Sequence, residues 1–276
     1  MPTLAVMLTL LGCGDSLGVM RGPDATNLGM PSSLRYYAAT GLLSEHVVGQ
    51  GEGAGAHYGV QYSQLSLPEA ADTLSVALEQ LAGIDPLTLG TQQDQLAYWL
   101  NLYNLGVLDG VVRSLSAQPS FSSVANDGFM LFKMPMVRVG EHTLTLDQIE
   151  HGVLRGQETV PIAEWHTSLW GKDPVDARIH FAVNCASMGC PDLQPLPWQA
   201  ATLDADLDRA GAAFVANPDK GAGPNGISEL FDWFSEDFAA HAGSVEAFVS
   251  SFREDGGAGV DFDARIPYDW SLNAAR

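Results

Sequence analysis

The segment that most constrains the fold is 94–115, whose apolar residues recur at steps of three and four. This spacing places them on one face of an α-helix of about six turns. The apolar stripe consists of Leu96, Trp99, Leu100, Tyr103, Val107 and Val111. Asn101 and Asn104 are unusual inside a helix, because Asn side chains compete for backbone hydrogen bonds. Asn104 lies near the stripe and needs a hydrogen-bond partner wherever it is buried.

Shorter elements surround this helix in an irregular order. Apolar periodicity and capping residues predict helices over 34–43, 68–81, 146–154, the segment after Thr202, and part of 228–238. Alternating or β-branched runs predict strands over 129–139, 142–145, 176–184 and 266–272, and Gly or Pro content predicts loops over 48–56 and 185–197. No βαβ spacing is present. We therefore expect an α+β fold, with several helices packed on a small, mostly antiparallel sheet in a single domain.

The charge balance excludes one class of partner. The chain has 13 Lys and Arg against 33 Asp and Glu, a formal net charge of -20. Nucleic acids bind mainly through Lys and Arg, and anionic lipid headgroups are repelled by acidic surfaces, so we expect no nucleic-acid partner. The sequence also contains no glycine-rich phosphate loop, no His-Glu-x-x-His motif and no Gly-x-Ser-x-Gly turn. No cofactor is indicated.

The N-terminal segment resembles a secretory leader. Residues 4–11 are apolar except for Thr9, and the run is too short to span a bilayer. It ends in Leu-Leu-Gly-Cys at 10–13, which resembles the cleavage motif of bacterial lipoproteins. We expect a signal segment over 1–13 ending at a lipidated Cys13, a tether over 14–31 and one globular domain over 32–276. The protein would then be lipid-anchored in the cell envelope, at the periplasmic face or the outer surface, and would contact the membrane only through its anchor. The alternative is a cytosolic protein with a hydrophobic N-terminus.

Five sequence blocks follow one another in a recognisable order. They are Trp99–Asn104, Leu146–Arg155, Arg178–Ser187, Phe231–Phe238 and Ile266–Asn273. Together they resemble the family catalogued as domain of unknown function 547, with Phe234 in place of the family's usual Tyr. The resemblance implies membership of a family whose biochemical role is not settled, and the N-terminal segment adds the expectation that this member is a bacterial lipoprotein.

Polar residues inside these blocks suggest a catalytic site. The candidates are Cys185, His180, His151, Glu150, Arg155, Asn101 and Asn104. A cysteine hydrolase or acyltransferase needs a thiolate, a base and a group that orients the base or stabilises an oxyanion. Cys185 is the candidate nucleophile, His180 or His151 the base, and Asn101 or Asn104 the orienting or oxyanion-binding group. Adjacent residues diverge on a regular helix, so we do not expect Glu150 and His151 in one site unless their helix is distorted.

Two other interpretations use the same residues. A Cys185–Cys190 disulfide would make the protein a non-catalytic binding or scaffold module, with an unidentified protein or small molecule as its partner. Cys185, Cys190, His180 and His151 would alternatively form a zinc site, although their spacing matches no standard zinc pattern. The aromatic residues of the blocks are expected in the core rather than around a ligand. Whether the protein is an enzyme stays open at this stage.

Overall fold

A computed structural model describes residues 35–276, except for 127 and 158–159. The expected signal segment ending at Cys13 and the tether over 14–31 lie outside the described residues. Within the described part, no helix is long and apolar enough to cross a membrane.

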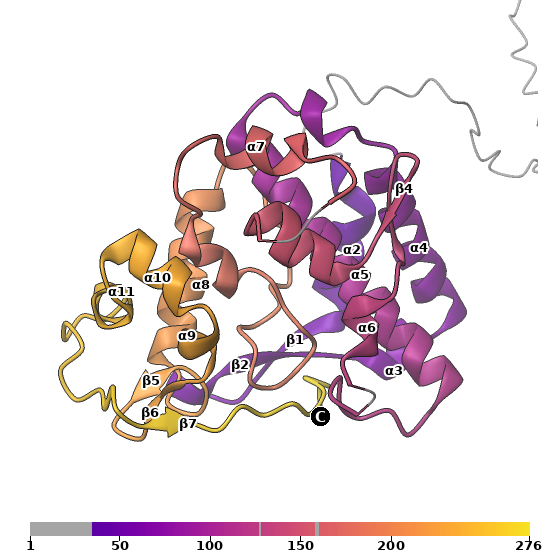
Figure 1. Ribbon diagram of the computed structural model, residues 1–276. Coiled ribbons are helices and arrows are strands. Elements are labelled where there is room, and N and C mark those ends of the chain that lie inside the picture. The colour runs from indigo at the N-terminus through magenta and orange to yellow at the C-terminus, as the bar shows by residue number, and fades with distance from the viewer. Residues whose placement is uncertain (1–34, 127, 158–159) are drawn as a thin grey trace, which may run out of the picture.

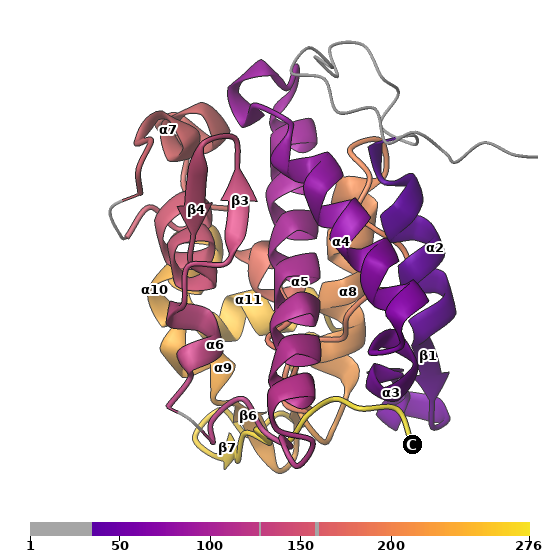
Figure 2. The same cartoon turned by 90° about the vertical axis from the view of Figure 1, so that its right-hand side faces the viewer.

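The central element is helix α5 (Gln92–Ala117), which contains the long predicted stripe. Thr91 caps its first turn by accepting a hydrogen bond from the backbone N–H of Asp94 at 3.0 Å. Figure 2 shows α5 running through the middle of the molecule, with α2 (Tyr37–His46) and α4 (Pro68–Ala82) on one side. The hairpin of β3 (Val137–Val139) and β4 (His142–Leu144) lies on the other side. Side chains from all faces of α5 are buried, because the helix is enclosed rather than covered on one side only.

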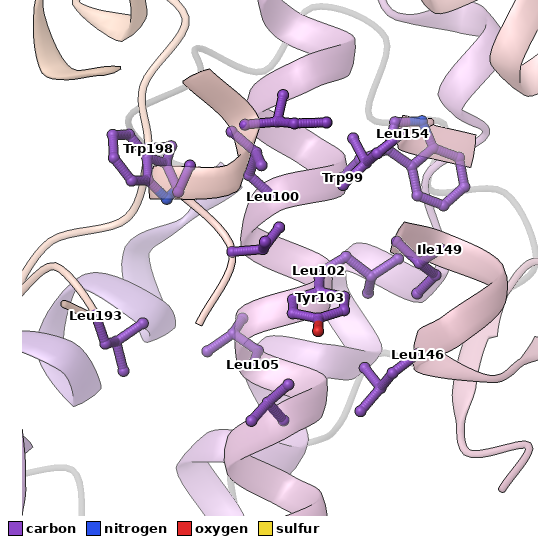
Figure 3. Close-up of a cluster of buried hydrophobic side chains, with 14 of the residues drawn as sticks. Trp99, Leu100, Leu102, Tyr103, Leu105, Leu146, Ile149, Leu154, Leu193 and Trp198 are labelled. Carbon is purple, nitrogen blue, oxygen red and sulfur yellow. The ribbon is translucent and has the colours of Figure 1, made fainter. Parts of the chain in front are cut away.

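Apolar side chains converge on α5 from segments far apart in the sequence. Figure 3 shows Leu146, Ile149 and Leu154 packing on one side of α5, with Leu193 and Trp198 on the other. The core cluster extends from Tyr36 to Val249, so it joins the N-terminal and C-terminal parts of the described chain.

The segment before α5 forms helices and one hairpin. Its elements are α2 (Tyr37–His46), β1 (Val47–Gln50), η1 (Gly53–Gly55), β2 (His57–Val60), α3 (Tyr62–Leu65), α4 (Pro68–Ala82) and η2 (Pro86–Thr88). The helices predicted over 34–43 and 68–81 are confirmed. The prediction of a loop over 48–56 is wrong in part, because β1 pairs with β2 from Val47–Val60 to Gln50–His57. The strand was not predicted because the segment is rich in glycine, which favours loops. Two of the glycines, Gly51 and Gly53, adopt positive φ at the turn.

The segment after α5 differs from its prediction at one strand. It contains α6 (Met130–Lys133), β3 (Val137–Val139), β4 (His142–Leu144), the π-helix η3 (Gln148–Leu154) and α7 (Glu164–Trp170). The strand predicted over 129–139 is reduced to β3, which pairs with β4 in an antiparallel hairpin. Phe129 takes a left-handed conformation with φ of 65° and starts a helical turn instead.

The segment 176–184 is not the predicted strand. Residues Ala177–Phe181 form a 3-10 helix, η4, because Asp176 caps it by accepting from the backbone N–H of Arg178 at 3.0 Å. Ile179, His180 and Phe181 are all buried, so their alternating pattern did not correspond to two faces of a sheet. The loop predicted over 185–197 is confirmed, and α8 (Leu203–Ala216) follows Thr202 as expected.

The C-terminal part contains β5 (Ala222–Gly223), β6 (Gly226–Ser228), α9 (Leu230–Trp233), α10 (Ser235–Ala242), α11 (Val245–Ser251) and β7 (Arg265–Ile266). Of the strand predicted over 266–272, only Ile266 belongs to a sheet, where β7 runs parallel to β6. Ser271 and Leu272 instead form isolated bridges with Ser123 and Ser187. The final segment, yellow in Figure 1, thus crosses elements from three parts of the chain.

The α+β prediction is confirmed. In the described part of the chain the strands are distributed over three small sheets, and all their pairs are antiparallel except β6 with β7.

Candidate functional site

All five sequence blocks meet at one pocket with a volume of about 430 Å³. The first block contributes Tyr103, and the last contributes Tyr268 and Trp270. The lining residues are Tyr103, Phe129, Phe132, Asp147, Glu150, His151, His180, Val183, Cys185, Cys190, Pro191, Leu230, Trp233, Phe234, Tyr268 and Trp270. The pocket is therefore assembled from residues that are up to 167 positions apart, between Tyr103 and Trp270.

A distorted helix brings Glu150 and His151 to the pocket together. These residues lie in the π-helix η3, and both line the pocket although they are adjacent in sequence. The helix starts at a reciprocal cap, in which Gln148 N–H donates to Thr145 Oγ1 and Thr145 N–H donates to Gln148 Oε1, each at 3.0 Å. Single π-turns are common at functional sites because they re-aim side chains. On a regular helix Glu150 and His151 would point in different directions. The π-helix is the distortion that allows both residues to line one pocket.

Glu150 is oriented by Tyr103. The Tyr103 hydroxyl donates to Glu150 Oε2 at 2.6 Å. Burial, followed by the charge of Glu150, raises the pKa of Tyr103 well above its ordinary value, so the phenol stays protonated and donates. Among the described residues, no side chain or backbone group forms a hydrogen bond with Glu150 Oε1. One carboxylate oxygen is thus fixed by the protein, and the other is available to a ligand.

A chain of hydrogen bonds links the two pocket histidines. Arg155 Nη1 donates to His151 Nδ1 at 2.9 Å, and Arg155 Nε donates to Asp237 Oδ2 at 2.6 Å. His180 Nε2 lies 2.8 Å from the same Asp237 oxygen. A guanidinium only donates and a carboxylate only accepts, so the proton of each neutral imidazole is assigned to Nε2.

Burial and hydrogen bonds together set the charges of His180 and Asp237. The side chain of His180 is fully buried, and burial lowers its pKa despite the opposing hydrogen bond with Asp237. Burial acts to raise the pKa of Asp237, but the hydrogen bonds from His180 and Arg155 outweigh it and hold that pKa below the ordinary value. Asp237 is therefore an anion that pairs with Arg155, and His180 is a neutral imidazole.

Phe234 holds the two nitrogen-bearing groups in place. The His180 ring stacks on the Phe234 ring with centroids 3.9 Å apart, and the Arg155 guanidinium lies 4.6 Å from the same ring centroid. Ring stacking and the cation–π contact limit the movement of both side chains. Contacts within the protein thus orient the His180 and Arg155 side chains.

Cys185 and Cys190 form a disulfide in the wall of the pocket. Cys185 Sγ also lies 3.0 Å from Ser187 Oγ and 3.3 Å from the Tyr268 hydroxyl. Among the described residues, no histidine forms a hydrogen bond with either sulfur. With the disulfide closed Cys185 has no thiol, so its role as a nucleophile stays a prediction that requires prior reduction.

Asn101 and Asn104 support the loops behind the pocket rather than line it. Asn101 donates to Trp198 O at 2.9 Å and accepts from Trp198 N–H at 2.8 Å. Asn104 donates to Ala182 O and accepts from Asn184 N–H, both at 2.9 Å. Each amide therefore binds one backbone N–H and one backbone C=O, which satisfies the partner expected for a buried Asn.

The aromatic residues divide into two groups. Trp99 and Tyr103 are buried in the core, as expected, and Tyr103 also lines the pocket. Trp233 is 44% exposed and stacks on Trp270 with centroids 5.4 Å apart, and Tyr268 lies 4.4 Å from Trp270. These three rings line the pocket together with Tyr103 and Phe234, so the aromatic residues of the blocks form a pocket wall as well as part of the core.

The structure offers no support for the zinc alternative. Among the described residues, no group of three or more His, Cys, Asp or Glu side chains has the geometry to hold a metal ion. The sequence interpretation missed Asp237 as the partner of His180. Its position in the sequence could have indicated a role, because Asp237 lies in the fourth block, three residues after Phe234.

Comparison with known families agrees with the sequence blocks. Residues 87–215 match the model of the family described as "Protein of unknown function, DUF547". This segment belongs to the DUF547 family. It includes the first three blocks. The last two blocks lie after residue 215, outside the matched segment, but their residues also line the pocket. No curated protein and no solved structure matches the chain.

Proposed function

We propose that this protein is a binding module of the cell envelope whose pocket takes a ligand the size of a small molecule or an amino-acid side chain. The observation that carries the proposal is the meeting of all five blocks at one pocket. Pockets with mostly apolar and aromatic walls and a few oriented polar groups are typical ligand sites. Tyr103 orients Glu150, and Phe234 holds His180 and Arg155, so the pocket is organised before binding.

The disulfide supports the non-catalytic form of this proposal. Cys185 is bonded to Cys190, which leaves no nucleophilic sulfur in the pocket. Disulfides persist in oxidising compartments, which agrees with an envelope location and a lipid anchor on Cys13. The disulfide also restricts the conformations of the loop 185–190, which forms part of the pocket wall.

A ligand-observed NMR screen of chemically varied fragments on the purified protein tests the proposal. We expect hits whose signals are lost with Trp233→Ala, because this change removes a ring from the pocket wall. Tyr37→Ala is the matched control, since Tyr37 is 75% exposed and does not line the pocket. The proposal is wrong if no fragment binds, or if every hit binds the Trp233→Ala variant as well as it binds the wild type.

Cysteine-dependent acyl chemistry is a second candidate, favoured by one observation. Cys185 lines the same pocket as His151 and His180. A dithiol reductant would convert the disulfide into two thiols while being oxidised to its own disulfide. Cys185 would then attack the acyl carbon of an ester or amide, and a histidine would take the thiol proton and return it to the leaving group.

The variant Cys190→Ser tests this candidate, because it leaves Cys185 as a thiol without any reductant. An activated thiol reacts with iodoacetamide well below the ordinary cysteine pKa of about 8.5 and forms an acyl-enzyme with p-nitrophenyl acetate. Labelling with the pH profile of an ordinary cysteine, together with no acyl-enzyme in the mass spectrum, would exclude the candidate. The double variant Cys185→Ser, Cys190→Ser provides the background rate.

A further inference from the structure

The ionisable groups in the pocket wall point to the charge of the ligand. The wall contains Asp147 and Glu150, and none of its described residues is Lys or Arg. The guanidinium of Arg155, which donates to the pocket residue His151, is already paired with Asp237 at 2.6 Å. From this geometry we infer that the ligand carries an alkylammonium group, which Glu150 binds next to the aromatic rings. This inference rests on the proposed binding function.

Two acceptor atoms of residues that line the pocket receive no hydrogen bond from the described part of the chain. Glu150 Oε2 receives the Tyr103 hydroxyl, whereas Oε1 receives no hydrogen bond from the described residues. His180 also lines the pocket, and its Nδ1 is buried without a hydrogen-bond partner in the described part of the chain. Because His180 Nε2 carries the proton, Nδ1 is an acceptor. An alkylammonium group supplies N–H donors and a positive charge, which complement the Glu150 carboxylate.

The aromatic rings provide the second part of the recognition. Trp233, Tyr268 and Trp270 contact one another with centroid separations of 4.4 to 5.4 Å. Their faces carry negative electrostatic potential and attract cations, most strongly for Trp. The rings also cover the hydrocarbon part of a ligand, so both ends of an alkylammonium compound find a complementary surface.

Ligands of other charge fit less well. A neutral apolar ligand would remove water from the Glu150 carboxylate without replacing its hydrogen bonds, which costs free energy. An anion would be repelled by Glu150 and by a chain whose net charge is -20. The pocket volume of about 430 Å³ accommodates an amine with an aromatic or short aliphatic body.

Three probes of nearly equal shape isolate the charge. Phenethylammonium, 2-phenylethanol and phenylacetate differ mainly in their polar end group, and their affinities are measured by calorimetry at pH 7 and low salt. We expect phenethylammonium to bind at least about tenfold more tightly than 2-phenylethanol, and phenylacetate to bind most weakly. Glu150→Gln keeps an acceptor for the Tyr103 hydroxyl but removes the charge, so we expect it to abolish the preference for the amine. Glu246→Gln, which removes an exposed carboxylate outside the pocket, should leave the affinities unchanged.

The outcomes separate this inference from the proposed function. Equal binding of the amine and the alcohol, or a preference that survives in Glu150→Gln, overturns the inference of an ammonium ligand. If neutral or anionic fragments bind the pocket and amines do not, the inference is wrong while the binding function stands. If neither these probes nor any fragment binds, the proposed function fails, and the inference fails with it.

Discussion

His180 and Asp237 are joined by a hydrogen bond of 2.8 Å between Nε2 and Oδ2, and Arg155 Nε donates to the same oxygen at 2.6 Å. One carboxylate thus connects a buried imidazole of the pocket wall with the guanidinium that also fixes His151. The pair joins η4 to α10, two elements that are 54 residues apart in the sequence, from Phe181 to Ser235. It therefore links the conformation of the pocket to the stability of the C-terminal helices.

The first prediction concerns the pH dependence of folding. Burial lowers the pKa of His180 in the folded protein below the ordinary histidine value of about 6.5, so the unfolded chain binds the proton first as pH falls. The stability from this group is complete above about pH 6.5 and is lost as pH falls through the folded-state pKa. The lowered pKa of Asp237 has the same sign at more acidic pH. We expect urea unfolding to show decreasing stability from pH 7 to pH 5.

The variant His180→Gln checks the source of this dependence. A glutamine can donate to Asp237 but does not titrate, so the slope between pH 7 and pH 5 should decrease, by up to about 1.4 kcal/mol per pH unit for one proton. His57→Gln is the control, because His57 lies outside the hydrogen-bonded chain. An unchanged slope in His180→Gln would assign the pH dependence to other groups.

The second prediction concerns the Cys185–Cys190 disulfide. Replacing both cysteines by serine should lower the free energy of unfolding by about 2 kcal/mol, the value for closing so short a loop. A reductant should shift the urea midpoint of the wild type in the same direction and leave that of the double variant unchanged. If the wild-type midpoint does not respond to the reductant, the disulfide does not stabilise the fold.

The third prediction concerns lipidation of Cys13, which lies outside the described residues. When the chain is expressed in a bacterium with lipoprotein-processing enzymes, we expect it in the membrane fraction, with incorporation of labelled palmitate. Cys13→Ser should release it into the soluble fraction without label, because it removes the sulfur that would receive the lipid. Glu246→Gln should behave as the wild type. A soluble, unlabelled wild-type protein would contradict the lipoprotein hypothesis.

Local patterns predicted most helices and little of the strand content. The stripe on α5 could be read directly, because a repeat of three and four residues has one structural solution over six turns. The run from Ile179 to Phe181 alternates as a strand does, yet Asp176 caps a 3-10 helix there and every side chain is buried. Alternation indicates a strand only when one set of residues faces solvent, and burial depends on contacts that the sequence does not display.

The sequence predicted most of the residues of the candidate site but little of their geometry. Glu150, His151, His180 and Cys185 were named from the blocks, and all of them line one pocket. Glu150 and His151 reach the pocket together because η3 is a π-helix, and no local sequence pattern predicts this distortion. The pairing of His180 with Asp237 and the exposure of Trp233 depend on how α9 and α10 pack, which follows from long-range contacts.

The last prediction tests the structural role of Asn104. Its amide donates to Ala182 O and accepts from Asn184 N–H, each at 2.9 Å, and the side chain is buried. Asn104→Ala leaves both backbone groups without a partner, at about 1–3 kcal/mol each, so we expect a total loss of about 2–6 kcal/mol in urea unfolding. Asn104→Asp keeps only the acceptor and should also destabilise the fold.

Gln93→Ala is the matched control for Asn104→Ala, since it removes an exposed amide from the same helix and should change stability by less than about 0.5 kcal/mol. Hydrogen exchange at the Asn184 amide gives a local readout, because this N–H loses its acceptor in Asn104→Ala. We expect faster exchange there even under conditions in which the variant stays folded. An unchanged exchange rate and a loss no larger than that of Gln93→Ala would show that Asn104 does not hold the loop, and its candidacy for a catalytic role would then reopen.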